Sequence, residues 1–87
     1  MKVRNMTGRT GRKVANQFII DNGMGTEYFQ SYETMIATKG MGTTKLDRSS
    51  WDYSNTTSKY RNQFLGMTTK EIKAKIKSGE ILLINLN

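Results

Sequence analysis

The sequence of 87 residues contains no cysteine, no histidine and no proline. Without cysteine, neither disulfides nor thiolate metal sites can stabilise the fold. The absence of histidine and cysteine also removes the commonest general base and the commonest nucleophile of enzymes, together with the usual ligands of zinc, copper and haem. The seven carboxylates are scattered, so no magnesium or calcium site is expected. We therefore expect no enzyme activity, no cofactor and no metal, with Ser54 or Ser58 beside Lys59 as the remaining catalytic alternative.

Long apolar runs are missing too. No stretch approaches the ~18 apolar residues of a membrane-spanning helix, and residues 1–13 lack the apolar centre of a signal peptide. We expect a soluble chain that stays inside the cell. A chain of this length is one domain, and it buries only roughly 60–65% of the surface that its unfolded form exposes. Its core must therefore be one compact cluster without a deep substrate chamber.

Positive charge is abundant. Fourteen Lys and Arg residues face seven Asp and Glu residues, which gives a net charge of +7. This excess predicts attraction to polyanions, namely nucleic acid, an acidic protein surface or a nucleoprotein complex. The basic residues gather toward both ends of the chain, whereas residues 14–44 hold more acids than bases. Solubility alone is the alternative interpretation of the same charge.

Residues 1–13 hold five basic residues and no acidic ones. Gly8 and Gly11 lie within this segment and disfavour a helix. We expect a flexible basic arm over residues 1–13, followed by a single domain over residues 14–87. Basic arms with glycine can wrap phosphates. A short edge strand at Lys2–Arg4 is the alternative.

The first half of the domain has the composition of β-strands. Val14–Asp21 predicts a strand, and the Asp-Asn-Gly sequence that ends it predicts a turn. In Thr26–Ala37 the alternation of apolar residues breaks near Ser31–Tyr32. That break indicates either a bulge or two short strands, with a helix over Tyr32–Thr38 as the alternative. A turn at residues 39–42 precedes a short return strand at Thr43–Leu46.

Two helices follow. Ser54 is a plausible N-cap for the first, with Asp52 as an alternative a little earlier, and Gly66 is its C-cap. Thr68 with Glu71 forms a capping box for the second, which Gly79 ends. Helical spacing places an aromatic stripe on one side of the first helix, and packing explains such a stripe better than base stacking does. The stripe consists of Tyr53, Thr57, Tyr60 and Phe64.

The apolar run Ile81–Leu86 predicts a final strand. The expected fold is therefore α+β, with a small antiparallel sheet of three to five strands and two helices packed on one face, in the order β-β-(β)-α-α-β.

The short turn between the helices would suit a helix-turn-helix. However, the second helix offers lysines, which contact phosphates, and no Arg, Asn or Gln to read base edges. We therefore expect non-specific phosphate contacts, or docking on an acidic or RNA-bearing surface, with Arg61 and exposed aromatic residues as anchors. Trp51 is assigned either to the core or to the interface. The candidate partner-binding residues are Arg9, Arg12, Lys13, Lys59, Arg61, Asn62, Lys70, Lys73, Lys77 and Trp51.

The stretch Trp51–Gly66, which reads WDYSNTTSKYRNQFLG, resembles a family of small accessory proteins encoded by tailed bacteriophages. Further matching elements are Asn16–Phe18, Tyr28–Tyr32, Thr69–Ile72 and Leu83–Asn87. The resemblance covers roughly residues 16–87. It implies a context, the cytoplasm of an infected bacterium, and no activity. Small phage accessory proteins are often anti-defence factors, including anti-CRISPR proteins, and this step is an analogy.

Together these observations predict a non-enzymatic phage protein that binds and inhibits a host nucleoprotein defence complex, most concretely an anti-CRISPR inhibitor of a Cas effector. The partner would be a host protein or ribonucleoprotein with an acidic or RNA-bearing surface, and no membrane is involved. A weakly sequence-specific binder of DNA or RNA is the first alternative, and a structural or assembly protein of the virion is the second.

Overall fold

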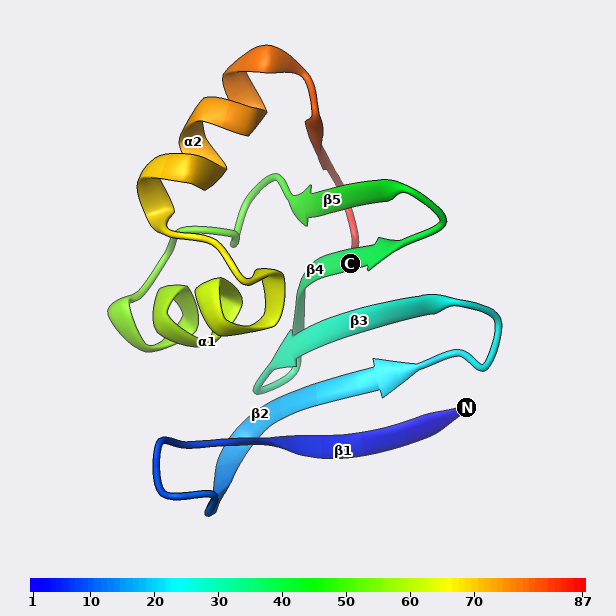
Figure 1. Cartoon of the computed structure of the whole chain (residues 1–87), viewed down its shortest axis with the longest axis vertical. Coiled ribbons are helices and arrows are strands. Elements are labelled where there is room, and N and C mark those ends of the chain that lie inside the picture. Colours follow the sequence, from blue (N-terminus) through cyan, green and yellow to red (C-terminus); the bar gives the residue numbers. More distant parts are fainter.

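The computed structural model describes all 87 residues and shows a six-stranded sheet with two helices packed against one of its faces (Figure 1). The strands lie side by side in chain order. They are β1 (Lys2–Thr7), β2 (Lys13–Asp21), β3 (Thr26–Ser31), β4 (Thr34–Gly40), β5 (Thr43–Asp47) and β6 (Ile81–Ile84), with α1 (Asn55–Leu65) and α2 (Thr69–Ser78) between the last two strands. The α+β class expected from the sequence is confirmed.

The sheet differs from the expected one in size and in direction. It has six strands rather than three to five, and it is mixed rather than antiparallel. Strands β1 to β5 form an antiparallel meander, whereas β6 pairs with β5 in parallel. The two helices cause this difference, because they carry the chain back across the sheet so that β6 starts beside the start of β5.

The N-terminal segment is also different from the expectation. The flexible arm expected over residues 1–13 is instead the edge strand β1 and its hairpin to β2, so the alternative of a short edge strand is the correct one. Met6 supplies the physical reason, since its side chain is only 3% exposed and belongs to the core. Gln63 of α1 secures the end of the strand, donating a hydrogen bond from Nε2 to the carbonyl oxygen of Thr7 at 2.9 Å.

Residues 26–37 form two strands joined by a tight turn, which is one of the two arrangements expected from the broken alternation. The turn runs through Ser31–Thr34, where Tyr32 adopts a positive φ of 56°. The helix considered over Tyr32–Thr38 does not form. A register shift after Phe29 marks a bulge in the β3–β4 pair, and this bulge lets Ile36 and Ala37 both face the core.

Both helices begin and end at the expected caps. Ser54 accepts a hydrogen bond from the backbone N–H three residues later, and Gly66 ends α1 in a left-handed conformation. Thr68 and Glu71 form a complete capping box, and Gly79 ends α2. Glu71 accepts hydrogen bonds from the backbone N–H and the hydroxyl of Thr68, and these hold the pKa of its carboxyl below the usual range. Neither helix has the length and apolar character needed to cross a membrane.

The core lies between the helices and the facing side of the sheet. Phe29 of β3 stacks on Phe64 of α1 with ring centroids 5.9 Å apart, and Ile72 of α2 is fully buried. Tyr53, expected at the head of the aromatic stripe, lies before the helix and is 53% exposed. The buried hydrophobic residues are Met6, Phe29, Ile36, Ala37, Leu46, Tyr60, Phe64, Ile72 and Ile81.

The end of β5 is fixed by a buried carboxylate. Asp47 accepts hydrogen bonds from the Ser50 hydroxyl and from the backbone N–H of Leu86, the latter at 2.9 Å. Burial raises the pKa of this carboxyl, but the hydrogen bonds outweigh burial and the resulting pKa lies below the ordinary value. The carboxylate therefore attaches the segment after β6 to the loop that leads into α1.

Candidate functional site

Arg61, the expected interface anchor, is buried and belongs to the interior of the fold. Its side chain is 0% exposed. Its guanidinium donates to the carbonyl oxygen of Trp51 at 2.6 Å, to Asn62 Oδ1 at 2.9 and 3.1 Å, to Thr69 Oγ1 at 3.1 Å and to Asp52 Oδ1 at 3.3 Å. Because a fully buried guanidinium must find partners for its N–H groups, the loop before α1 and the start of α2 close over it.

Trp51 and Asn62 belong to the same buried network. The guanidinium carbon of Arg61 lies 5.2 Å from the Trp51 ring, a cation–π contact. Trp51 is half-buried and packs against the core, and Asn62 also donates to Thr69 Oγ1 at 3.0 Å. Arg61 and Asn62 thus join α1 to α2 through Thr69, and Trp51 packs on Arg61 from the preceding loop. Arg61 has no exposed surface with which to anchor a partner. Trp51, which the sequence assigned either to the core or to the interface, contacts the core.

The other seven candidates are exposed cations, and they lie on two separate parts of the fold. None of the seven lies within 4.0 Å of a carboxylate. We call the first group the hairpin surface, which consists of Arg9, Arg12 and Lys13 in the β1–β2 hairpin together with Lys59 on α1. We call the second group the α2 surface, which consists of Lys70, Lys73 and Lys77. The β1–β2 hairpin and α2 lie toward opposite ends of the long axis of the molecule (Figure 1).

The hairpin surface contains an open hollow that no hydrophobic residue lines. Its lining residues are Thr7, Gly8, Arg9, Lys59 and Gln63, and its volume is about 370 Å³. Arg9 and Lys59 come from different elements, and the hydrogen bond from Gln63 to Thr7 holds these elements together. Two cations beside a polar hollow without a carboxylate can receive a phosphate group. The sequence contained no signal that Arg9 and Lys59 lie beside the same hollow. Their proximity depends on the contact between Thr7 and Gln63, which are 56 positions apart.

The α2 surface follows directly from helical spacing. Lys70, Lys73 and Lys77 recur at intervals of three and four residues and are exposed, so they line one face of the helix. Lys75 lies apart from them and pairs with Glu80 at 3.0 Å. This pairing, with Ser78, lowers the pKa of the Glu80 carboxyl. The α2 surface can therefore contact phosphates along a backbone but presents no group that reads base edges.

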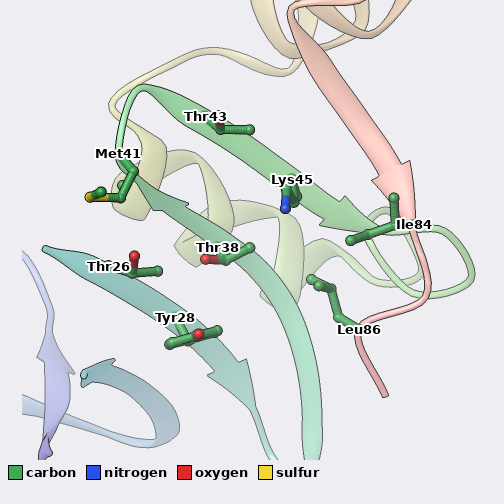
Figure 2. Close-up of a pocket in the computed structure, with 9 residues that line it drawn as sticks. Thr26, Tyr28, Thr38, Met41, Thr43, Lys45, Ile84 and Leu86 are labelled. Carbon is green, nitrogen blue, oxygen red and sulfur yellow. The ribbon is translucent and has the colours of Figure 1, made fainter. Parts of the chain in front are cut away.

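The face of the sheet that the helices leave uncovered holds a third feature. An open hollow of about 330 Å³ lies there, over β3, β4 and β5 and beside the end of β6 (Figure 2). Tyr28, Thr38 and Lys45 pair in register across three neighbouring strands, so their side chains share this face. The remaining lining residues are Thr26, Gly40, Met41, Thr43, Ile84 and Leu86. The sequence did not point to this face, because it did not show which side of the sheet the helices cover.

The structure brings together no group of three acidic, cysteine or histidine side chains that could hold a metal ion. Ser54 and Ser58, the serines considered beside Lys59, have structural partners: Ser54 caps α1, and the Ser58 hydroxyl donates to Asp52 Oδ1 at 3.2 Å.

Comparison with known proteins finds no match among curated proteins or solved structures. One protein family, DUF8033, described as a family of unknown function, matches residues 1–80. The match includes β1 and the basic hairpin, which the resemblance to phage proteins had left outside, and it ends between α2 and β6. The chain therefore belongs to the DUF8033 family.

Proposed function

We propose that this protein binds the phosphate backbone of nucleic acid, without catalysis and without reading sequence. The observation that carries the proposal is the distribution of unpaired charge. Of the fourteen basic residues, only Arg4, Lys39, Arg61 and Lys75 pair with a carboxylate. The other ten are left to attract a polyanion, and seven of them form the hairpin surface and the α2 surface. Phosphate contacts of this kind supply most of non-specific nucleic-acid affinity.

The types of exposed residue support a backbone ligand over a protein ligand. Protein interfaces depend on a few buried aromatic and arginine anchors, and here the two residues nominated for that role, Arg61 and Trp51, are engaged inside the fold. The hairpin surface instead presents Arg and Lys beside small polar residues, and the α2 surface presents lysines. Such groups position a phosphate backbone well and discriminate poorly between bases.

The test compares two triple variants by fluorescence anisotropy with a labelled duplex at low salt. One variant, Arg9→Ala with Arg12→Ala and Lys59→Ala, removes three charges from the hairpin surface. The other, Lys70→Ala with Lys73→Ala and Lys77→Ala, removes three from the α2 surface. We expect each to weaken binding and to flatten the salt dependence by about 2 to 3 in log–log slope, since each phosphate contact contributes about 0.9.

The control is the double variant Lys75→Ala with Glu80→Ala. It removes an existing ion pair and leaves the net charge unchanged, so it should bind as the wild type does. Equal affinity of both triple variants and the wild type would refute the proposal.

Inhibition of a host nucleoprotein defence complex, with an anti-CRISPR inhibitor as the concrete form, is the second candidate. The observation that favours it is the resemblance of Trp51–Gly66 to proteins of tailed bacteriophages. A tagged protein added to lysate of a defence-competent host tests it, with and without nuclease. A Cas effector or another defence protein that stays bound after nuclease treatment supports this function, whereas proteins that are lost with the nucleic acid support backbone binding alone. Unchanged plaque counts on every defence-competent host would count against it.

A further inference from the structure

We infer that the uncovered face of the sheet binds single-stranded nucleic acid, with a base stacked on Tyr28 and a neighbouring phosphate held by Lys45. This inference rests on the proposed function and adds the strandedness of the ligand. The observation behind it is the hollow over β3, β4 and β5 shown in Figure 2.

The geometry of the face suits an extended strand. Tyr28 of β3, Thr38 of β4 and Lys45 of β5 are register partners. Because adjacent strands are about 4.8 Å apart, the Cα atoms of Tyr28 and Lys45 are separated by roughly 10 Å. A base stacked on the tyrosine ring then leaves the adjoining phosphate within reach of the long lysine side chain.

The chemistry of the lining also favours an unpaired strand. An aromatic ring on an open sheet stacks any base, because every base has a π-face, and this face is accessible only when the strand is single. The hydroxyls of Thr26, Thr38 and Thr43 both donate and accept hydrogen bonds, so they tolerate different base edges. No carboxylate lines the hollow, and Lys45 has no acidic partner.

Charge argues against a second copy of the chain as the occupant. Each copy carries a net charge of +7, and packing two such faces together would bring both copies of Lys45 into a shared, partly desolvated interface. A polyanion bound in the hollow would instead neutralise the positive charge of Lys45. The face also continues past the hollow through exposed apolar side chains, since Val3 is 61% exposed and Leu82 45% exposed at its two edges. That width leaves room for more than one nucleotide.

The experiment measures affinity by fluorescence anisotropy for a single-stranded oligothymidine and for a duplex of the same length, at one salt concentration. Tyr28→Leu removes the ring but keeps an apolar side chain in β3. We expect it to weaken single-strand binding about 5- to 150-fold, because stacking on one aromatic residue contributes that much, and to leave duplex binding unchanged. Tyr28→Phe should retain wild-type affinity.

Tyr53→Ala is the matched control, because Tyr53 is exposed in the loop before α1, away from this face, and its loss should leave both affinities unchanged. Amide chemical shifts of the wild-type protein give a readout that needs no variant. Oligothymidine should shift the signals of Tyr28, Thr38 and Lys45.

Two results of the binding experiments overturn the inference while leaving the proposed function intact. One is equal single-strand affinity of the wild type and Tyr28→Leu. The other is a set of shifts confined to the hairpin and α2 surfaces. Self-association of the free protein through the uncovered face, detected by sedimentation and abolished in Tyr28→Leu, would also overturn it. Failure of the wild type to bind any nucleic acid refutes the proposed function itself.

Discussion

The buried Arg61 network gives the sharpest test of the fold. Arg61 joins three parts of the chain, since its guanidinium bonds the carbonyl of Trp51 in the preceding loop, Asn62 in α1 and Thr69 in α2. The substitution Arg61→Ala removes a fully buried side chain, leaves these acceptors without a donor and opens a cavity. A buried acceptor left unsatisfied costs about 1–3 kcal/mol, and the cavity adds to this, so we expect a total loss of about 3–5 kcal/mol. A domain of this size is stable by roughly 4–13 kcal/mol, so the variant should be marginally stable.

The assay is urea unfolding followed by far-UV circular dichroism. Tryptophan fluorescence is a poor probe here, because Arg61 contacts the Trp51 ring and its substitution would itself change the signal. Arg61→Lys should also lose stability, since a single ammonium cannot reach the acceptors that the planar guanidinium bonds on three sides. Lys59→Ala is the control, because this exposed residue two positions earlier should change the free energy of unfolding by no more than about 0.5 kcal/mol. A loss below about 1 kcal/mol for Arg61→Ala would refute the structural role of the network.

Two further predictions concern the sheet. A Cβ atom on Gly40, whose φ is 148°, would lie 2.2 Å from the carbonyl oxygen of Gly25, whereas Gly42, with φ of 76°, has open space around it. Gly40→Ala should therefore lower the free energy of unfolding by clearly more than the ~1–2 kcal/mol that a left-handed backbone costs at Gly42→Ala, and equal losses in urea unfolding would contradict this. Because the folded pKa of Asp47 is lowered, its carboxylate contributes stability that is complete above about pH 5 and is lost as the pH falls past the unfolded value of about 3.9 toward the folded pKa. Asp47→Asn should make the free energy of unfolding depend less on pH over that acidic range. The same pH dependence in the variant and the wild type would show that the Asp47 carboxylate does not cause it.

The features that the sequence predicted well are those with local causes. The caps at Ser54, Gly66, Thr68 and Gly79 depend on residues within one helical turn of each other, so their residue types alone indicated where the helices begin and end. The strand over β2 followed in the same way from composition and the turn after it.

The features that the sequence did not predict depend on contacts between distant segments. Arg61 follows a buried aromatic residue in α1, and nothing in the local pattern shows that the 51–54 loop and α2 close over it. Met6 is a single apolar residue in a basic segment, so its burial against the core was not visible either. The parallel direction of β6 depends on the path of both helices.

The candidate site shows the same division. The α2 surface required only helical spacing, and the sequence predicted its three lysines. The hollow between Arg9 and Lys59 depends on β1 joining the sheet, which an arm over residues 1–13 would not do. The pairing of Tyr28 with Lys45 across β4 depends on strand register, and strand register needs the complete sheet.

The most direct test of the account is the salt dependence of nucleic-acid binding by the wild-type protein. Anisotropy titrations with a labelled duplex and a labelled single strand, repeated over a series of salt concentrations, give the slope of log affinity against log salt. We expect a steep linear fall, with a slope near −0.9 for each phosphate contacted on the duplex and near −0.7 on the single strand. An affinity that does not change with salt, or no binding at low salt, would contradict the proposal that this protein binds nucleic acid through its unpaired basic residues.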